Sequence, residues 1–312
     1  MMSRISLTIS SMTLGTVQLG LPYGIQPGAD PMATDLSLSI LQEAFDNGIT
    51  TLDTARAYGV SEDVIGAFLR MAPAGAFPHI ITKFRLPEEL EPTHTESIRR
   101  VVRDSLDASL AALGRERVTA LLFHQSPRQK MQSFVAPLGD ILLELMEDGR
   151  IESGGLSAFR PSEAHSVIGH PAFRCVQLPM NIFDNTSVRH GLLDALHADG
   201  IFVFIRSVFL KGLFFMKPEQ LTGNLTVAAP YLRQLASIAV ATGLSMDELA
   251  YIFVRDTPGV CSVIFGADAP GHVTANARLS RLPSLDDRVR QQLQEVFTDL
   301  PEHIIVPFLW KP

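Results

Sequence analysis

Residues 47–59, Asn-Gly-Ile-Thr-Thr-Leu-Asp-Thr-Ala-Arg-Ala-Tyr-Gly, carry the pattern that decides the fold of this chain. A short run rich in β-branched residues, 50–54, lies between two stretches with the apolar spacing of amphipathic helices, 35–48 and 61–70. Gly48 ends the first of these stretches, as glycine commonly ends helices. A strand between two helices predicts one repeat of a parallel βαβ arrangement.

The same alternation extends along the whole chain. Further strands are expected at residues 12–20, 79–84, 119–124, 154–159, 175–178, 202–207 and 262–265. Further helices are expected at residues 95–113, 137–148, 161–168, 188–198, 230–242, 246–256, 273–280 and 286–297. Eight strand–helix units close a barrel. We therefore expect an α/β fold, a (β/α)8 TIM barrel with an N-terminal β-hairpin and a C-terminal extension, forming a single domain over residues 1–312.

A doubly wound sheet is the alternative architecture. It would carry a G-x-G-x-x-G turn after its first strand, and the sequence has none.

Composition narrows the class of protein. Hydrophobic residues make up 46% and charged residues 19% of 312, which argues against disorder. The net charge of -7 gives no basic field for nucleic acid. Two cysteines exclude a disulfide scaffold, and no apolar run approaches the roughly 18–20 residues of a spanning helix. With no signal-peptide pattern at the N-terminus, we expect a soluble, cytoplasmic protein without nucleic-acid or membrane partners.

Polar side chains stand at the ends of neighbouring expected strands. Asp53, Lys83 and His124 end the second, third and fourth strands, and Tyr58 follows Asp53 in the next loop. Each alone has an ordinary structural explanation, such as a turn aspartate or a core histidine. Because active sites of such barrels lie at the carboxyl ends of the strands, the four together predict a catalytic site.

These residues resemble the aldo-keto reductase family. The matching stretches are residues 14–16, 47–55, 57–59, 82–83, 122–124 and 155–157, with Phe159 and Gln177, and more weakly 207–213. The resemblance covers about residues 12–297. It implies a barrel that binds a nicotinamide dinucleotide without the Rossmann glycine motif. The implied reaction is reversible hydride transfer between the cofactor and a carbonyl carbon, with Asp53, Tyr58, Lys83 and His124 as the catalytic residues.

Elementary chemistry agrees with those roles. Carbonyl reduction needs a proton at oxygen, and a nearby ammonium favours the phenolate, so Lys83 is expected to make Tyr58 a better proton donor. Asp53 would keep Lys83 charged and in place. His124 would orient the carbonyl oxygen by hydrogen bonding.

The resemblance also implies a set of cofactor contacts. Ser157 and Gln177 match residues that bind the nicotinamide carboxamide, and the segment from Ser207 to Gly212 matches a loop over the pyrophosphate. The full expected set is Gly15, Thr16, Asp53, Ser157, Gln177, Arg206, Ser207, Phe209, Lys211, Gly212, Gly266, Asp268 and Asn276.

Two positions depart from the family pattern. Ala158 stands where asparagine is common, and Arg206 stands where an aromatic residue usually stacks on the nicotinamide. A guanidinium can also stack on a ring, but a cation would repel an oxidised nicotinamide. A salt-bridged Arg206 at the strand end is the alternative.

The choice between the two nicotinamide cofactors stays open. The family prior is NADP(H), whose users commonly carry Arg or Lys near residues 263–270. Here Asp268 stands instead, and a carboxylate near the ribose favours the 2′-hydroxyl of NAD(H). Arg278 is the remaining candidate for a 2′-phosphate.

The substrate is expected to be a small carbonyl compound, an aldehyde, ketone or aldose. Candidate contacts are Tyr23, Arg56, Arg85 and Trp310, and the arginines favour a polar or anionic compound unless they pair with acids on the helices. Alternative functions are a cofactor-binding regulatory subunit and a Schiff-base lyase using Lys83. No histidine or cysteine cluster suggests a metal site, and the oligomeric state is undetermined.

Overall fold

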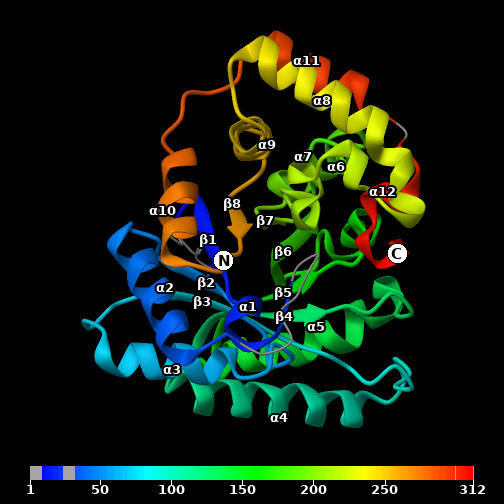
Figure 1. Ribbon diagram of the computed structural model, residues 1–312. Helices are drawn as coiled ribbons and strands as arrows, with labels where there is room; N and C mark the ends of the chain where they lie inside the picture. The colour runs from blue at the N-terminus through cyan, green and yellow to red at the C-terminus, as the bar shows by residue number, and fades with distance from the viewer. Residues whose placement is uncertain (1–8, 24–31, 299, 312) are drawn as a thin grey trace.

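The centre of the molecule is a closed barrel of eight parallel strands in chain order (Figure 1). The computed structural model describes residues 9–23, 32–298 and 300–311. The strands are β1 (Met12–Gly15), β2 (Thr51–Asp53), β3 (His79–Phe84), β4 (Val118–His124), β5 (Ile151–Ser157), β6 (Phe173–Pro179), β7 (Phe202–Arg206) and β8 (Ser262–Phe265). Pairing of β1 with β8 closes the sheet, which confirms the predicted TIM barrel.

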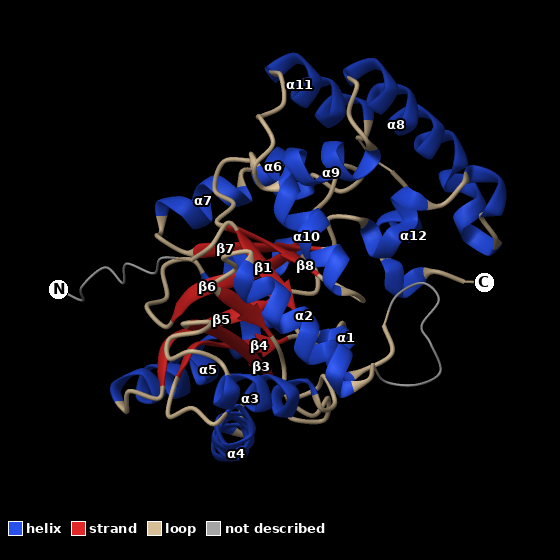
Figure 2. Cartoon of the chain, turned by 60° about the vertical axis from the view of Figure 1, so that its left-hand side comes forward, coloured by secondary structure: helices blue, strands red, loops and turns tan. Residues whose placement is uncertain are grey.

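Helices surround the strands (Figure 2). The first half contributes α1 (Val17–Gly20), α2 (Thr34–Asp46), α3 (Ser61–Met71), α4 (Thr95–Leu113) and α5 (Met131–Glu147). The second half contributes η1 (Pro161–Val167), α6 (Thr186–Arg189), α7 (Leu192–Ala198), η2 (Leu210–Phe215), η3 (Pro218–Gln220), η4 (Gly223–Ala228), α8 (Ala229–Thr242), α9 (Met246–Arg255), α10 (Pro270–Leu279) and α11 (Asp287–Val296). The C-terminal extension holds α12 (Glu302–Ile305) and η5 (Pro307–Leu309).

The first predicted strand was too long. β1 ends at Gly15, and the chain then turns into α1, where the Leu21 amide donates to the Val17 carbonyl (2.9 Å). Most of the predicted N-terminal hairpin lies on residues 1–8, outside the described residues, and residues 9–11 form no strand.

Two helices also differ from their predictions. α5 begins at Met131, six residues before the predicted start at Pro137, and this proline lies inside the helix. The predicted helix over 188–198 is two short helices, because Gly191 between them adopts a left-handed backbone (φ 67).

The barrel interior explains where the polar strand ends point. Ile81, Ala120, Leu122, Cys175 and Phe204 form a buried apolar cluster inside the strands. Side chains alternate along a strand, so the next inward side chain on each strand is two residues further toward its carboxyl end. These are Lys83, His124, Gln177 and Arg206. They form the floor of the barrel mouth.

No single helix in the described ranges is long and apolar enough to cross a membrane; residues 223–242 and 246–255 meet that test only as a pair bent by 87°.

Candidate active site

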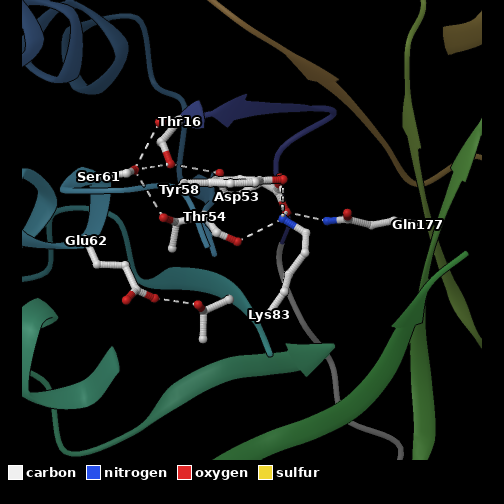
Figure 3. Close-up of polar contacts among 9 residues, drawn as sticks. Thr16, Asp53, Thr54, Tyr58, Ser61, Glu62, Lys83 and Gln177 are labelled. Atoms are coloured by element: carbon white, nitrogen blue, oxygen red, sulfur yellow. Dashed lines mark hydrogen bonds and ion pairs between the residues drawn. The ribbon is translucent and has the colours of Figure 1, made fainter. Parts of the chain in front are cut away.

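A buried ion pair between Asp53 and Lys83 lies at the centre of the barrel mouth (Figure 3). Lys83 Nζ donates to Asp53 Oδ2 (2.8 Å), to the Thr54 carbonyl (2.8 Å) and to the Tyr58 hydroxyl (3.3 Å). Lys83 is 2% exposed and Asp53 4%. Burial alone would lower the pKa of Lys83, but Asp53 and Tyr58 outweigh it and raise that pKa above its usual value. Lys83 is therefore an ammonium group at neutral pH.

Tyr58 is held over this pair by a close contact between two loops. A Cβ added to Gly20 would lie 1.8 Å from the Tyr58 carbonyl, and one on Gly59 (φ 58) would lie 2.3 Å from the Gly20 carbonyl. Both positions therefore require glycine, and Gly59 also needs its left-handed backbone. The Tyr58 amide donates to the Ala55 carbonyl (2.9 Å). Its ring lies 4.8 Å from Lys83 Nζ.

His124 faces Tyr58 from the end of β4. The two rings meet edge to face with centroids 6.1 Å apart. Burial, with Lys83, Arg85 and Arg206 nearby, lowers the pKa of His124 to about 2, so its imidazole is uncharged at neutral pH. Its Nδ1 has no hydrogen-bond partner within the described part of the chain. His124 thus offers a neutral hydrogen-bonding group beside the Tyr58 ring.

Gln177 completes the group around Asp53. Its Nε2 donates to Asp53 Oδ1, so its amide nitrogen is already engaged, and its carbonyl oxygen has no hydrogen-bond partner among the residues that the structure describes (Figure 3). Ser157, which pairs with Gln177 across β5 and β6, is buried.

A cavity of about 300 Å³ opens from Asp53 and Tyr58 toward β1, β7 and β8. It is lined by Gly15, Thr16, Val17, Gln18, Tyr23, Asp53, Tyr58, Arg206, Ser207, Val208, Phe209, Lys211, Gly212, Phe215, Ile264, Phe265, Gly266 and Asp268. Its volume lies at the lower limit for small-molecule pockets. A Cβ on Gly266 would lie 2.3 Å from Gln18 Nε2, so the glycine keeps this wall open.

The segment after β7 has an unusual backbone. Ser207 (φ 66), Leu210 (φ 47) and Lys211 (φ 52) are left-handed, and Gly212 follows at φ 94. Such conformations are sparsely populated by non-glycine residues and cluster at ligand-binding loops. Consecutive left-handed turns can aim backbone amides at an anion, which makes the loop suitable for a phosphate group.

Comparison with known proteins identifies the family. The model of the Aldo/keto reductase family matches residues 11–297. The chain belongs to the aldo/keto reductase family.

Two characterised relatives align along most of the chain. It is 25% identical to L-galactose dehydrogenase of Arabidopsis thaliana, over 89% of this chain and 87% of that one. It is 24% identical to L-glyceraldehyde 3-phosphate reductase of Escherichia coli, over 86% and 85%. The solved holo structure of an aldo-keto reductase from Bacillus halodurans superposes with a TM-score of 0.73 at 19% identity, covering 95% of both chains.

In this aldo/keto reductase Arg206 forms no salt bridge with any described residue, so the salt-bridged alternative is wrong for the part of the chain that the structure describes. Its guanidinium donates to the Ala158 carbonyl (2.9 Å) and the Ser207 hydroxyl (3.4 Å), both uncharged. Arg206 therefore contributes to the cavity wall a positive charge that has no ion-pair partner among the described residues.

The candidate contacts for the adenosine end of a dinucleotide lie beyond β8. Asp268 lines the cavity, and its amide donates to His272 Nδ1 (3.3 Å). Asn276 lies off the cavity lining and donates to the His272 carbonyl (2.7 Å). Arg278, the candidate for a 2′-phosphate, is paired with Glu248 (3.0 Å).

The structure separates the four candidate substrate residues. Tyr23 lines the cavity under Lys211, whose Nζ lies 5.4 Å from the ring centroid. Arg56 is paired with Glu62 on α3 (2.6 Å), as in the alternative of arginines that pair with helix acids. Arg85 is exposed, and Trp310 donates to the Ile304 carbonyl (3.2 Å) without lining the cavity.

Sequence reasoning missed Glu62 and Gln18. Glu62 is fully buried and accepts from both Arg56 and Thr82 (2.5 Å), tying the loop that carries Tyr58 to β3. An acidic residue in the first turn of a helix usually faces solvent, so the sequence pattern concealed this role. Gln18 forms a cavity wall, and its buried Oε1 lacks a described partner.

No group of three His, Cys, Asp or Glu side chains in the described ranges could hold a metal ion.

Proposed function

We propose that this aldo/keto reductase reduces the carbonyl group of a small aldehyde, ketone or aldose with a nicotinamide dinucleotide as hydride donor, and that Tyr58 supplies the proton. The observation that carries the proposal is the contact of one buried ammonium, Lys83, with both Asp53 and the Tyr58 hydroxyl at the inner end of a cavity.

The protein's own part of the reaction is proton transfer and charge stabilisation. When bound, a reduced nicotinamide would supply the hydride for the new C–H bond, and the carbonyl π-electrons would move to oxygen. Tyr58 gives its proton to that oxygen, and the resulting phenolate is stabilised by Lys83, which Asp53 keeps charged. Neutral His124 hydrogen-bonds the same oxygen and orients the carbonyl toward Tyr58.

The cavity suits the nicotinamide end of the cofactor. Gly15 and Gly266 leave space along one wall, while Ser207 and Lys211 supply a left-handed loop and a cation for the pyrophosphate. Ser157 and Gln177 are our candidates for the carboxamide, with Gln177 accepting through its free oxygen. Thr16 and Phe209 complete the proposed lining, and Asn276 the adenine contact.

We propose NAD(H) as the preferred cofactor. The carboxylate at Asp268 opposes a 2′-phosphate, and Arg278, which would have to bind one, is held by Glu248. The test is kcat/KM with NADH and NADPH on the same carbonyl substrate. A hundredfold preference for NADPH would overturn this proposal without affecting the assignment of Tyr58.

The substrate range follows the site and the relatives. The names of the two relatives specify a sugar and a phosphorylated aldehyde. Tyr23 lines the cavity, and exposed Arg85 lies near His124, so both are candidates for polar contacts with such a substrate. Arg56 is engaged with Glu62, so we assign it to support of the Tyr58 loop rather than to substrate.

The lyase alternative is disfavoured by the same contacts. A Schiff base requires an unprotonated lysine, whereas Asp53 helps to raise the pKa of Lys83.

The decisive experiment is Tyr58→Phe, measured with NADH and a panel of aldehydes, ketones and sugars. Loss of the proton donor should reduce kcat by about 10²–10⁴-fold. Cofactor affinity, followed by fluorescence of the bound reduced nicotinamide, should change by less than about twofold, because the cavity keeps its other walls. Turnover near that of the wild type would show that Tyr58 is not the proton donor. Tight cofactor binding with no turnover of any carbonyl by the wild type would favour the regulatory-subunit alternative.

A further inference from the structure

One positive charge on the floor of the barrel mouth, that of Arg206, has no negative partner among the described residues. Lys83 and Asp53 form an ion pair and cancel. His124 is neutral because its pKa is held near 2. Arg206 is then left with neutral acceptors only, the Ala158 carbonyl and the Ser207 hydroxyl. Among the floor residues Lys83, Asp53, His124, Gln177 and Arg206, the guanidinium of Arg206 is therefore the one charge without an ion-pair partner in the described part of the chain. Higher on the cavity lining, Lys211 and Asp268 carry opposite charges.

The charge of Arg206 lies where a reacting ring has to be placed. The inner end of the cavity is bounded by Asp53, Tyr58 and Arg206. A ring that delivers hydride to a carbonyl hydrogen-bonded to Tyr58 must lie at this end, since reacting atoms approach to about 3–3.5 Å. Arg206 is partly shielded from water, and burial lowers its pKa, yet guanidinium remains charged at any ordinary pH. Its field inside the cavity is thus only weakly screened.

We propose that Arg206 discriminates between the two redox states of the bound nicotinamide, so that this chain binds the reduced cofactor in preference to the oxidised one and readily releases the oxidised form. The inference rests on the proposed function. The oxidised nicotinamide ring is a cation and the reduced ring is uncharged, so only the oxidised form is repelled by Arg206. Every other part of the dinucleotide, including both phosphates, is the same in the two forms.

The expected size of the effect follows from Coulomb's law. Two unit charges about 6 Å apart at an effective dielectric constant of about 20 repel strongly enough to change an affinity by roughly a hundredfold. Partial screening by solvent at the open cavity leaves a tenfold effect as a conservative expectation.

Lys211 provides an internal control. It also lines the cavity, has no carboxylate partner among the described residues, and is half-buried above Tyr23. It belongs to the loop proposed for the pyrophosphate, whose charge does not depend on redox state. Removing Lys211 should therefore weaken both forms of the cofactor equally, whereas removing Arg206 should change their ratio.

The experiment measures binding rather than turnover. Dissociation constants for NADH and NAD⁺ are determined by isothermal titration calorimetry for wild type, Arg206→Met, Arg206→Lys and Lys211→Met, with Tm measured for each. We expect the wild type to bind NADH at least tenfold more tightly than NAD⁺. Arg206→Met should reduce that ratio at least tenfold, mainly by binding NAD⁺ more tightly. Arg206→Lys should keep the wild-type ratio, and Lys211→Met should keep the ratio while weakening both ligands. Arg206→Gln serves as a second neutral variant if the methionine variant does not fold.

The contrary outcomes are distinct. An equal ratio in wild type and both neutral variants would overturn the role of Arg206, as would equal weakening of both ligands, which would make it a simple anchor. If Arg206→Lys gave the same affinity ratio as Arg206→Met, the shape of the side chain rather than its charge would matter, and the proposed role of Arg206 would be overturned. Failure of the wild type to bind either nucleotide, or NADPH and NADP⁺ in their place, would instead contradict the proposed function.

Discussion

The two walls of the cavity differ in how their charged side chains are paired. On the side of β2 to β4 the buried acids have ion-pair partners: Asp53 pairs with Lys83, and Glu62 with Arg56. On the side of β7 and β8, Arg206 and Lys211 have no ion-pair partner among the described residues. A buried charge without a partner costs free energy unless a ligand compensates it. The charges on the β2–β4 side are therefore compensated within the folded protein, and we call this side the completed wall. The charges on the β7–β8 side are compensated only when a ligand binds, and we call this side the wall that a ligand completes.

The largest effect is expected from breaking the completed wall at Lys83. Lys83→Met leaves the Asp53 carboxylate buried without its cation, which should cost about 3–5 kcal/mol of unfolding free energy. The kcat of any surviving protein should fall about 10²–10⁴-fold, because the Tyr58 phenolate loses its stabilising charge.

Urea denaturation and steady-state kinetics measure the two effects separately. The double variant Asp53→Asn/Lys83→Met removes both charges and should recover much of the stability but none of the activity. Recovery of activity in the double variant would contradict the role of Lys83 in catalysis.

Glu62 belongs to the same wall but forms no hydrogen bond or ion pair with the proposed catalytic residues, so it tests the stability of that wall alone. Glu62→Gln removes a fully buried carboxylate that binds both Arg56 and Thr82, and should destabilise the protein by about 2–3 kcal/mol. Asp63→Asn is the matched control, because Asp63 contacts the same Arg56 at 3.8 Å but its side chain is 60% exposed. Its effect should stay below about 0.5 kcal/mol. Equal effects of the two variants in denaturation experiments would show that burial of Glu62 is unimportant.

This contrast also explains what the sequence could reveal. The barrel and nearly every strand were predictable, because alternation leaves a local signal. The meeting of Asp53, Tyr58, Lys83 and His124 at one barrel mouth was predictable too, because three of them end neighbouring strands; their catalytic role stays a proposal. Whether these side chains contact one another depends on the register of the strands, which the structure gives. Glu62 and Gln18 left no such signal, since their burial depends on contacts with segments distant in sequence. For the same reason a salt bridge for Arg206 was a reasonable expectation, although no described acid reaches it.

His124 gives the completed wall a predicted pH dependence. Its pKa falls from 6.5 to about 2 on folding, so the unfolded chain binds the extra proton first. The stability that His124 contributes is fully present above pH 6.5 and is lost as the pH falls toward 2. Between pH 7 and pH 5 the loss amounts to about 2 kcal/mol at most, at about 1.36 kcal/mol per unit.

Unfolding free energies of wild type and His124→Gln at pH 7 and pH 5 measure this contribution. The wild type should lose up to about 2 kcal/mol more than the variant over this range. His197→Gln, at a solvent-exposed position, should lose as much as the wild type. Identical losses in wild type and His124→Gln would show that His124 is not kept neutral by the fold.

The smallest effect is expected from the wall that a ligand completes. Gly266→Ala would place a Cβ 2.3 Å from Gln18 Nε2, so the Gln18 amide, which lines the cavity, would have to shift. Stability should change by less than about 1 kcal/mol, while affinity for the reduced cofactor should fall about tenfold. Gly271→Ala, in the first turn of α10 with open space around it, is the control and should change neither. The double variant Gln18→Ala/Gly266→Ala removes the displaced amide and should restore most of the affinity. If Gly266→Ala instead destabilised the protein as strongly as Glu62→Gln, the β8 wall would be a rigid part of the folded core, and the difference between the two walls would be lost.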